Sequence, residues 1–182
     1  MKTISDHVLD IIQNSVAAGA TLIEIMVCEE ETSDLYAFEI KDNGRGMSLA
    51  EIEMAIQPFY TTRTTRKVGL GLPLLKQNTE LAGGKLLVDS VPGSGTTVRA
   101  EFRLSHIDRP PAGDFPGVFV LSALGHPAVD FTYRHTTLYG QFAISTAEIR
   151  ETLEGMPLHT PGVRKAIQDL VTENIAGIKA NR

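Results

Sequence analysis

Residues 3–18 carry apolar side chains at the spacing of an amphipathic helix. The apolar positions recur every three or four residues, and a helix of 3.6 residues per turn brings them to one face. This stripe consists of Ile4, Val8, Ile11 and Ile12, and it ends at Ser15. The pattern predicts a helix that packs on a sheet and stops at Gly19 and Ala20.

Two strand-like segments follow this helix. Residues 22–27 and residues 35–41 are apolar or alternate between apolar and polar positions. The acidic residues 29–34 between them are expected to form a hairpin loop. The second strand would then deliver Asp42 at its end.

The pattern beyond Asp42 predicts two more helices and a second hairpin. Ser48 and Glu51 stand three residues apart, which is the signature of a capping box for a helix over residues 48–56. A second amphipathic helix follows Pro73, because the first turn of a helix tolerates the missing N–H. Strands are expected over residues 85–91 and 96–104, joined by a Pro-Gly-Ser-Gly turn.

The chain changes character at residues 105–114, where two prolines and a glycine break any regular pairing and indicate a linker. We therefore expect an α+β domain over residues 1–104 and a small α+β extension over residues 115–182. Within the extension, the patterns predict strands over residues 119–124, 130–136 and 140–144, and helices over residues 146–153 and 161–178. Thr146 is expected to cap the first of these helices.

The composition is that of a globular protein and excludes some partners. With 182 residues, 42% of them hydrophobic, the chain can bury one core and at most a small satellite. A formal net charge of −5 leaves no basic footprint for nucleic acid. No apolar run approaches the roughly 20 residues that a membrane-spanning helix needs.

The N-terminus and the cysteine content indicate a cytoplasmic location. The first residues lack the long apolar core of a signal peptide, and the single Cys28 excludes an internal disulfide. Cys28 is either a buried filler or a reactive thiol, and the lack of a cationic neighbour in the sequence favours the filler.

Asp42 is the first residue with candidate chemistry. An ionised carboxylate only accepts hydrogen bonds, so in a dry pocket it selects a donor such as the exocyclic amine of adenine. Gly44 and Gly46 let the backbone turn freely and approach a flat ligand. Asp-Asn-Gly is also an ordinary turn sequence, so this stretch alone leaves both interpretations open.

Asp10 and Asn14 stand four residues apart and project together from a face of the first helix. A carboxylate and an amide one turn apart can hold a hydrated cation, or orient a water, beside a phosphate chain. Ordinary solvated polarity of a helix surface is the alternative.

Residues 61–67 have no hydrophobic period and contain three cations, Arg63, Arg66 and Lys67. The segment is either a mobile phosphate-seeking loop or a solubilising one. The small residues Gly69 and Gly71 stand before the following helix, whose N-terminus can present backbone N–H groups to an anion.

Together these stretches resemble the ATP-binding domain shared by sensor histidine kinases, gyrase, Hsp90 and MutL, which has the Bergerat fold. The resemblance covers residues 3–104 and implies a two-layer α/β sandwich. Residues 8–15 resemble the N box, residues 42–47 the first glycine box, and residues 69–72 the second glycine box. Pro58 and Phe59 resemble the F box of the kinases, and residues 95–97 resemble the closing strand of the domain.

The resemblance assigns a role to each matching position. Asp10 would occupy the position of the general base, and Asn14 would ligate Mg²⁺. Asp42 would read the adenine amine of ATP or ADP, with Thr96 assisting it. The other implied nucleotide-binding residues are Gly44, Gly46 and Met47 around the base, Gly69, Leu70, Gly71 and Leu72 in the second glycine box, and Arg63, Arg66 and Lys67 in the lid.

Two departures from the family pattern bear on turnover more than on nucleotide binding. Many members carry Glu where this chain has Asp10, and the shorter side chain reaches less far towards an attacking water or hydroxyl. Lys67 stands where the second glycine box usually has another glycine.

The resemblance implies an ATP-dependent enzyme of histidine-kinase-like type that phosphorylates a protein partner or hydrolyses ATP slowly. None of the five histidines lies in an obvious phospho-acceptor motif, and no room precedes the N box for the helical hairpin that carries one, so a kinase would act on another protein. A non-catalytic, nucleotide-gated protein-binding switch is the alternative. The first glycine box and its flanks also look like MutL, especially residues 14–20, but the short lid and the acidic surface argue against DNA repair.

The extension carries no catalytic signature. It is expected either to dock a protein partner or to add a layer to the sheet, and His135 is expected to be a packed strand residue rather than a ligand. The sequence does not predict an oligomeric state.

Overall fold

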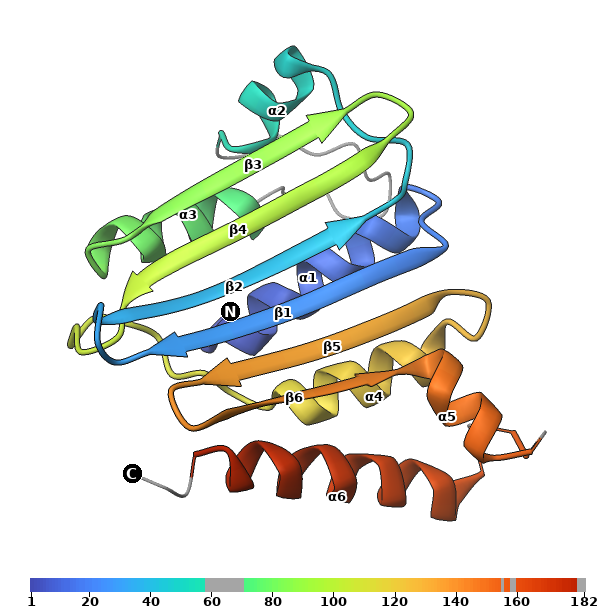
Figure 1. The fold of residues 1–182 in the computed structure, drawn as a ribbon. Coiled ribbons are helices and arrows are strands. Elements are labelled where there is room, and N and C mark those ends of the chain that lie inside the picture. Colours follow the sequence, from blue (N-terminus) through green and yellow to red (C-terminus); the bar gives the residue numbers. More distant parts are fainter. Residues whose placement is uncertain (58–70, 155, 158–159, 180–182) are drawn as a thin grey trace.

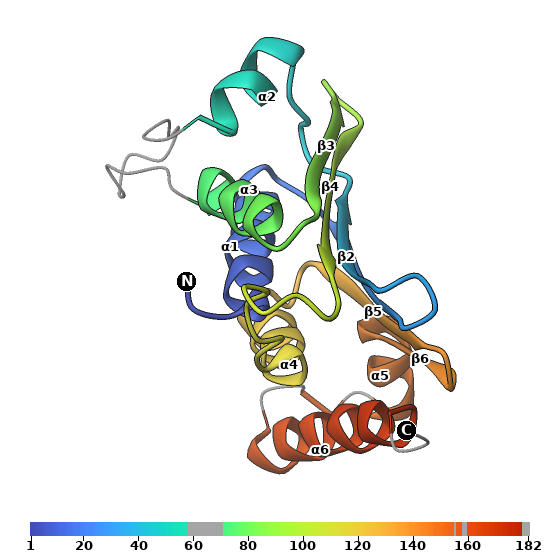
Figure 2. The ribbon, with the colours of Figure 1, turned by 90° about the vertical axis from the view of Figure 1, so that its left-hand side faces the viewer.

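A six-stranded sheet with helices on one face forms the centre of the molecule (Figures 1 and 2). The computed structural model describes residues 1–57, 71–154, 156–157 and 160–179. The strands are β1 Leu22–Glu30, β2 Leu35–Asp42, β3 Lys85–Val91, β4 Gly95–Arg103, β5 Asp130–Thr137 and β6 Gly140–Ser145. The helices are α1 Ile4–Ala17, α2 Leu49–Ala55, α3 Gly71–Leu81, α4 Phe115–Gly125, α5 Thr146–Thr152 and α6 Pro161–Gly177.

The order of strands in the sheet is β3-β4-β2-β1-β5-β6. All neighbouring strands are antiparallel except β1 and β5, which run parallel. Figure 2 shows α1, α3 and α4 on one face of the sheet, with no described helix on the other face. This arrangement confirms the predicted two-layer α/β sandwich.

Burial along the strands follows this one-sided packing. In β1 the side chains of Ile23, Ile25 and Val27 are buried, while those between them are partly exposed. Such alternation is typical of a sheet with one face on the core and one face in water. The first face packs on α1, whose predicted stripe of isoleucines and Val8 is buried.

Of two predicted helix caps, the structure confirms the cap of α2 and corrects the cap of α5. Ser48 caps α2 and forms the capping box with Glu51 that the sequence predicts. The cap of α5 is Ser145 and not Thr146, because Ser145 sits three residues before Glu148, and the two side chains form the capping box. Thr146 is instead buried, and its hydroxyl accepts from the backbone N–H of Phe131.

The predicted strand over residues 119–124 is wrong, because this run lies inside helix α4. Nearly every residue of the run is apolar, so its hydrophobic pattern fits a buried helix as well as a buried strand. The signals that decide lie upstream: Asp114 accepts from the N–H of Gly117, and Pro116 stands in the first turn.

β1 also differs from its prediction, since it continues to Glu30 into the stretch expected to be a loop. The turn between β1 and β2 occupies residues 31–34.

The sheet is continuous across the predicted division at residues 105–114. These residues form no helix or strand, and backbone hydrogen bonds from Ile4 to Pro111 and from Ser5 to Ala112 tie them to the start of α1. β5 then returns beside β1, and one hydrophobic core includes residues from both sides, such as Phe38 and Phe119. The extension therefore adds two strands to the edge of the sheet at β1.

No helix in the described ranges is both long and apolar enough to cross a membrane.

Candidate functional site

Asp42 ends β2 with its side chain buried beneath α1. It is 9% exposed, its Oδ2 accepts from the Ser15 hydroxyl at 2.6 Å, and its Oδ1 accepts from the Gly44 N–H at 2.9 Å. Each carboxylate oxygen thus has one donor from the protein and keeps lone pairs for another. The arrangement holds an acceptor-only group in one orientation.

The chain after Asp42 turns tightly against the β3–β4 hairpin. Gly46 has a φ of +66°, and a Cβ there would overlap the carbonyl oxygen of Val91. Gly95 has a φ of +103°, and a Cβ there would overlap the carbonyl oxygen of Asp42. Side chains are therefore excluded at both positions, and the first glycine box lies directly on the β3–β4 turn.

Asn43 fixes the other side of this turn. Its Oδ1 accepts from the N–H groups of Thr21 and Leu22 at 2.8 and 3.0 Å, and its Nδ2 donates to the Thr21 hydroxyl at 2.9 Å. The side chain is a structural anchor between the start of β1 and the end of β2.

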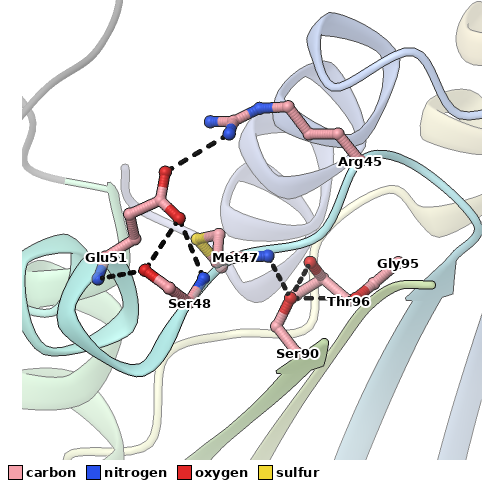
Figure 3. A network of polar contacts seen from close by, with 7 residues as sticks. All are labelled: Arg45, Met47, Ser48, Glu51, Ser90, Gly95 and Thr96. Carbon is pink, nitrogen blue, oxygen red and sulfur yellow. Dashed lines mark hydrogen bonds and ion pairs between the residues drawn. The ribbon is translucent and has the colours of Figure 1, made fainter. Parts of the chain in front are cut away.

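Met47 and Thr96 are joined through Ser90 (Figure 3). The Ser90 hydroxyl donates to the Gly95 carbonyl at 2.8 Å and accepts from the Met47 N–H at 2.8 Å. Because its one proton is used, the Thr96 hydroxyl, 2.8 Å away, must donate to it.

Thr96 faces Asp42 across the β2–β4 pair. In the described part of the chain the Thr96 hydroxyl bonds to Ser90 and not to the carboxylate. The predicted assistance of Thr96 to Asp42 therefore stays a prediction.

Asp10 and Gly71 meet at the start of α3. A Cβ on Gly71 would overlap the Asp10 Oδ2, so the N box on α1 directly contacts the second glycine box. The N-terminus of a helix carries partial positive charge and unpaired N–H groups, which suit a phosphate. Asn14 follows one turn after Asp10 on α1, and Ser15 beside it reaches Asp42. One helix thus carries both Asp10, which contacts the start of α3, and Ser15, which bonds to Asp42.

Leu72 packs against the hydrophobic core as the second residue of α3. The remaining predicted positions in this region lie outside the described residues. They are Arg63, Arg66 and Lys67 in the lid, Gly69 and Leu70 in the second glycine box, and Pro58 and Phe59 in the F box.

Asp10 and Asn14 fit a site in which Mg²⁺ has only one or two protein ligands, rather than a site built entirely from protein side chains. The described residues contain no cluster of three or more His, Cys, Asp or Glu side chains that would hold a metal alone. Asn14 and Asp10 offer oxygen ligands only, and Mg²⁺ is commonly held by one or two such groups with waters and substrate phosphates.

Ser15 and Ser90 are the site residues that the sequence analysis missed as such. Both are polar residues at inward positions, Ser15 at the end of an apolar helix stripe and Ser90 in a strand that otherwise turns Leu86 and Val88 inward. A polar side chain at such a position needs a partner, and this is the signal that could have found them.

A sequence model of the "Histidine kinase-, DNA gyrase B-, and HSP90-like ATPase" family matches residues 2–106. Three similar proteins are a provisionally named sensor protein of Shewanella frigidimarina, the non-motile and phage-resistance protein of Caulobacter vibrioides, and the cell-division control histidine kinase PdhS of Brucella ovis. They are 33%, 27% and 29% identical to this chain over 55%, 63% and 56% of its residues. The chain spans only 16%, 15% and 11% of their own lengths.

Among solved structures, the N-terminal domain of a DNA repair protein superimposes with a TM-score of 0.57. The match is 20% identical and covers 80% of this chain and 53% of that one. At this identity the similarity concerns the fold alone.

Proposed function

Since the chain belongs to the histidine kinase-, DNA gyrase B- and HSP90-like ATPase family, with residues 2–106 as its ATP-binding domain, we propose that it binds ATP with Mg²⁺ and transfers the γ-phosphoryl group. The acceptor is a side chain of a protein partner or, more slowly, water. The observation that supports this proposal most strongly is the buried Asp42 carboxylate, which Ser15 and Gly44 orient where β2 enters a tight glycine turn.

Asp42 suits the adenine ring. Its free lone pairs accept the exocyclic amine, while a purine that presents a carbonyl oxygen at the same position would face it with a second acceptor. A buried site that leaves an acceptor unpaired discriminates strongly between such ligands. The close backbone approach at Gly46 and Gly95 fixes the turn that follows Asp42 against the β3–β4 hairpin.

Asp10 and Asn14 serve the phosphate end of the proposed site. Asn14 would offer its amide oxygen to Mg²⁺, which on binding neutralises phosphate charge during phosphoryl transfer. Asp10 would accept the proton of the attacking hydroxyl or water, and its contact with Gly71 keeps it at the N-terminus of α3.

The length of Asp10 supports a second candidate function, a nucleotide-gated protein-binding module without chemistry. An aspartate is one methylene shorter than the glutamate of many family members and reaches less far. ADP release from purified protein, measured with and without partner proteins, separates the two functions. Release above background supports phosphoryl transfer or hydrolysis, whereas nucleotide-dependent partner binding without release supports the gated module.

Asn14→Ala tests the metal assignment. We expect the substitution to weaken ATP binding about tenfold in Mg²⁺ and to leave binding in EDTA within about twofold, because the amide serves the phosphates and not the base. Calorimetric titration in both conditions is the measurement. Asn174→Ala on the exposed surface of α6 is the matched control. Equal losses in Mg²⁺ and EDTA would contradict the assignment.

A further inference from the structure

His7 is a buried ionisable side chain for which the proposed reaction has no role. It is 2% exposed on α1, and its Nε2 lies 3.0 Å from the Nδ2 of Asn78 on α3. An amide nitrogen only donates, so Nε2 accepts and the ring proton resides on Nδ1. Nδ1 has no hydrogen-bond partner within the described part of the chain.

This hydrogen bond joins the same two helices that form the phosphate end of the site. Asp10 follows His7 by three residues, which places it on the same side of α1 one turn on. α1 and α3 pack side by side, and Asp10 contacts Gly71 at the first residue of α3 (Figures 1 and 2). A change in the His7–Asn78 distance would therefore change the separation of Asp10 from the helix N-terminus.

We propose that His7 and Asn78 are positioning residues for Asp10, holding α1 and α3 at the spacing that the γ-phosphate end of the site requires. The inference rests on the proposed function, in which Asp10 accepts the proton. Neither side chain touches the nucleotide in this account, and both act through the carboxylate and the start of α3.

The charge state of His7 matters for this role. Burial lowers the pKa of His7, the positive charge of the N-terminal amine lowers it further, and the carboxylates of Asp10 and Asp6 oppose both effects. The other ionisable groups on the helices packed against α1 are Lys76 and Glu80 on α3 and Asp114 at the start of α4. A neutral ring accepts from Asn78, whereas a protonated ring would present a donor to a donor and place a cation beside Asp10.

Proton NMR of the imidazole tests the coupling without any turnover. His7→Gln identifies the resonance, and the pKa of His7 is then measured in wild type and in Asp10→Asn. We expect Asp10→Asn to lower this pKa by about half a unit, since it removes an attracting charge. Asp108→Asn, an exposed carboxylate in the linker, should leave it unchanged. An unchanged pKa in Asp10→Asn overturns the proposal.

Kinetics then separates positioning from mere structural support. We expect His7→Leu to lower kcat for ADP release about tenfold with KM and ATP affinity within about twofold, and His7→Gln to restore most of the rate because its amide oxygen also accepts from Asn78. Wild-type rates should fall on acidification with the pKa measured for His7, and the Gln variant should lose this step. Equal rates in the Leu and Gln variants would overturn the proposal. Failure of wild type to bind ATP would overturn the proposed function instead, while the NMR titration would still decide the coupling.

Discussion

At the scale of single residues, the proposed site depends on the hydrogen bonds that orient Asp42. The resemblance of several ordered motifs to one family predicts a nucleotide-binding role for this carboxylate, whereas the aspartate and two glycines after a strand also fit an ordinary turn. Neither interpretation assigns a role to Ser15, which occupies the end of an apolar helix stripe and reads as a core position. Its hydroxyl instead donates to the carboxylate at 2.6 Å, a contact between residues 27 positions apart in the chain. Contacts at this separation depend on tertiary packing and leave little trace in a local pattern.

Ser15→Ala should weaken ATP and ADP binding equally, by about three- to tenfold. The substitution removes one hydrogen bond to a charged group and leaves the Asp42 carboxylate less oriented, at a cost of about 1 kcal/mol. Calorimetric titration with both nucleotides is the measurement. Ser5→Ala is the control, because Ser5 is a buried serine on the same helix whose hydroxyl bonds to Thr3. An unchanged affinity in Ser15→Ala would contradict a role for this serine in the proposed adenine site.

At the scale of elements, alternating and helical periods predicted most helices and strands correctly. Hydrophobic periodicity does not predict α4, because this helix is apolar on nearly every side. The residues that indicate a helix there are the N-cap Asp114 and Pro116 in the first turn. Hydrophobic periodicity also does not predict contacts between loops, such as the contact of the turn at Gly46 with the β3–β4 hairpin. That contact explains why each of the two segments has a glycine, Gly46 or Gly95, where its backbone meets the other segment.

Gly46→Ala should destabilise the protein much more than Gly93→Ala. Both glycines have positive φ, +66° and +79°, but a Cβ at Gly46 overlaps the Val91 carbonyl, whereas a Cβ at Gly93 meets nothing within 4 Å. We expect a loss of about 1–2 kcal/mol for Gly93→Ala from backbone strain alone, and more than about 3 kcal/mol for Gly46→Ala. Urea unfolding measures both. Similar losses of unfolding free energy in the two variants would show that the close approach of Gly46 to Val91 does not contribute to stability.

At the scale of the whole molecule, the extension joins the ATP-binding domain through strand pairing and a buried polar cluster. His135 on β5 lies between Glu29 on β1 and the Tyr133 hydroxyl, at 3.0 and 2.8 Å, and is a packed strand residue as predicted. Lys179, after α6, reaches Glu29 at 2.5 Å. The sequence could not predict this cluster, because it pairs β1 with a strand more than a hundred residues later. The cluster thus connects Lys179, which follows α6, to strand β1 of the central sheet.

Glu29 should make stability depend on acid pH. Burial alone would raise the pKa of Glu29, but hydrogen bonds from His135 and Lys179 and the positive charge of Lys179 outweigh it and hold the pKa at about 2 instead of 4.5. The unfolded state therefore binds more protons between these values, and the free energy of unfolding falls as pH falls from 4.5 towards 2.

Glu29→Gln should remove this contribution, which is at most roughly 3 kcal/mol. Stability measured by urea unfolding at several pH values should depend less steeply on acid pH in the variant than in wild type. Glu30→Gln is the control, since Glu30 is the neighbouring exposed carboxylate on β1. The same acid slope in Glu29→Gln and wild type would contradict the role assigned to the cluster.

The central claim, that Asp42 reads the amine of adenine, is tested most directly by comparing ATP with inosine triphosphate in wild type and in Asp42→Asn. Inosine presents a carbonyl oxygen where adenine has its amine. We predict that wild type prefers ATP by about tenfold to a hundredfold, the value of one charge-assisted hydrogen bond, and that Asp42→Asn loses this preference because its amide both donates and accepts. Asp89→Asn, the same change at an exposed position on β3, should retain the preference. Equal binding of the two nucleotides by wild type, or an undiminished preference in Asp42→Asn, would contradict the claim.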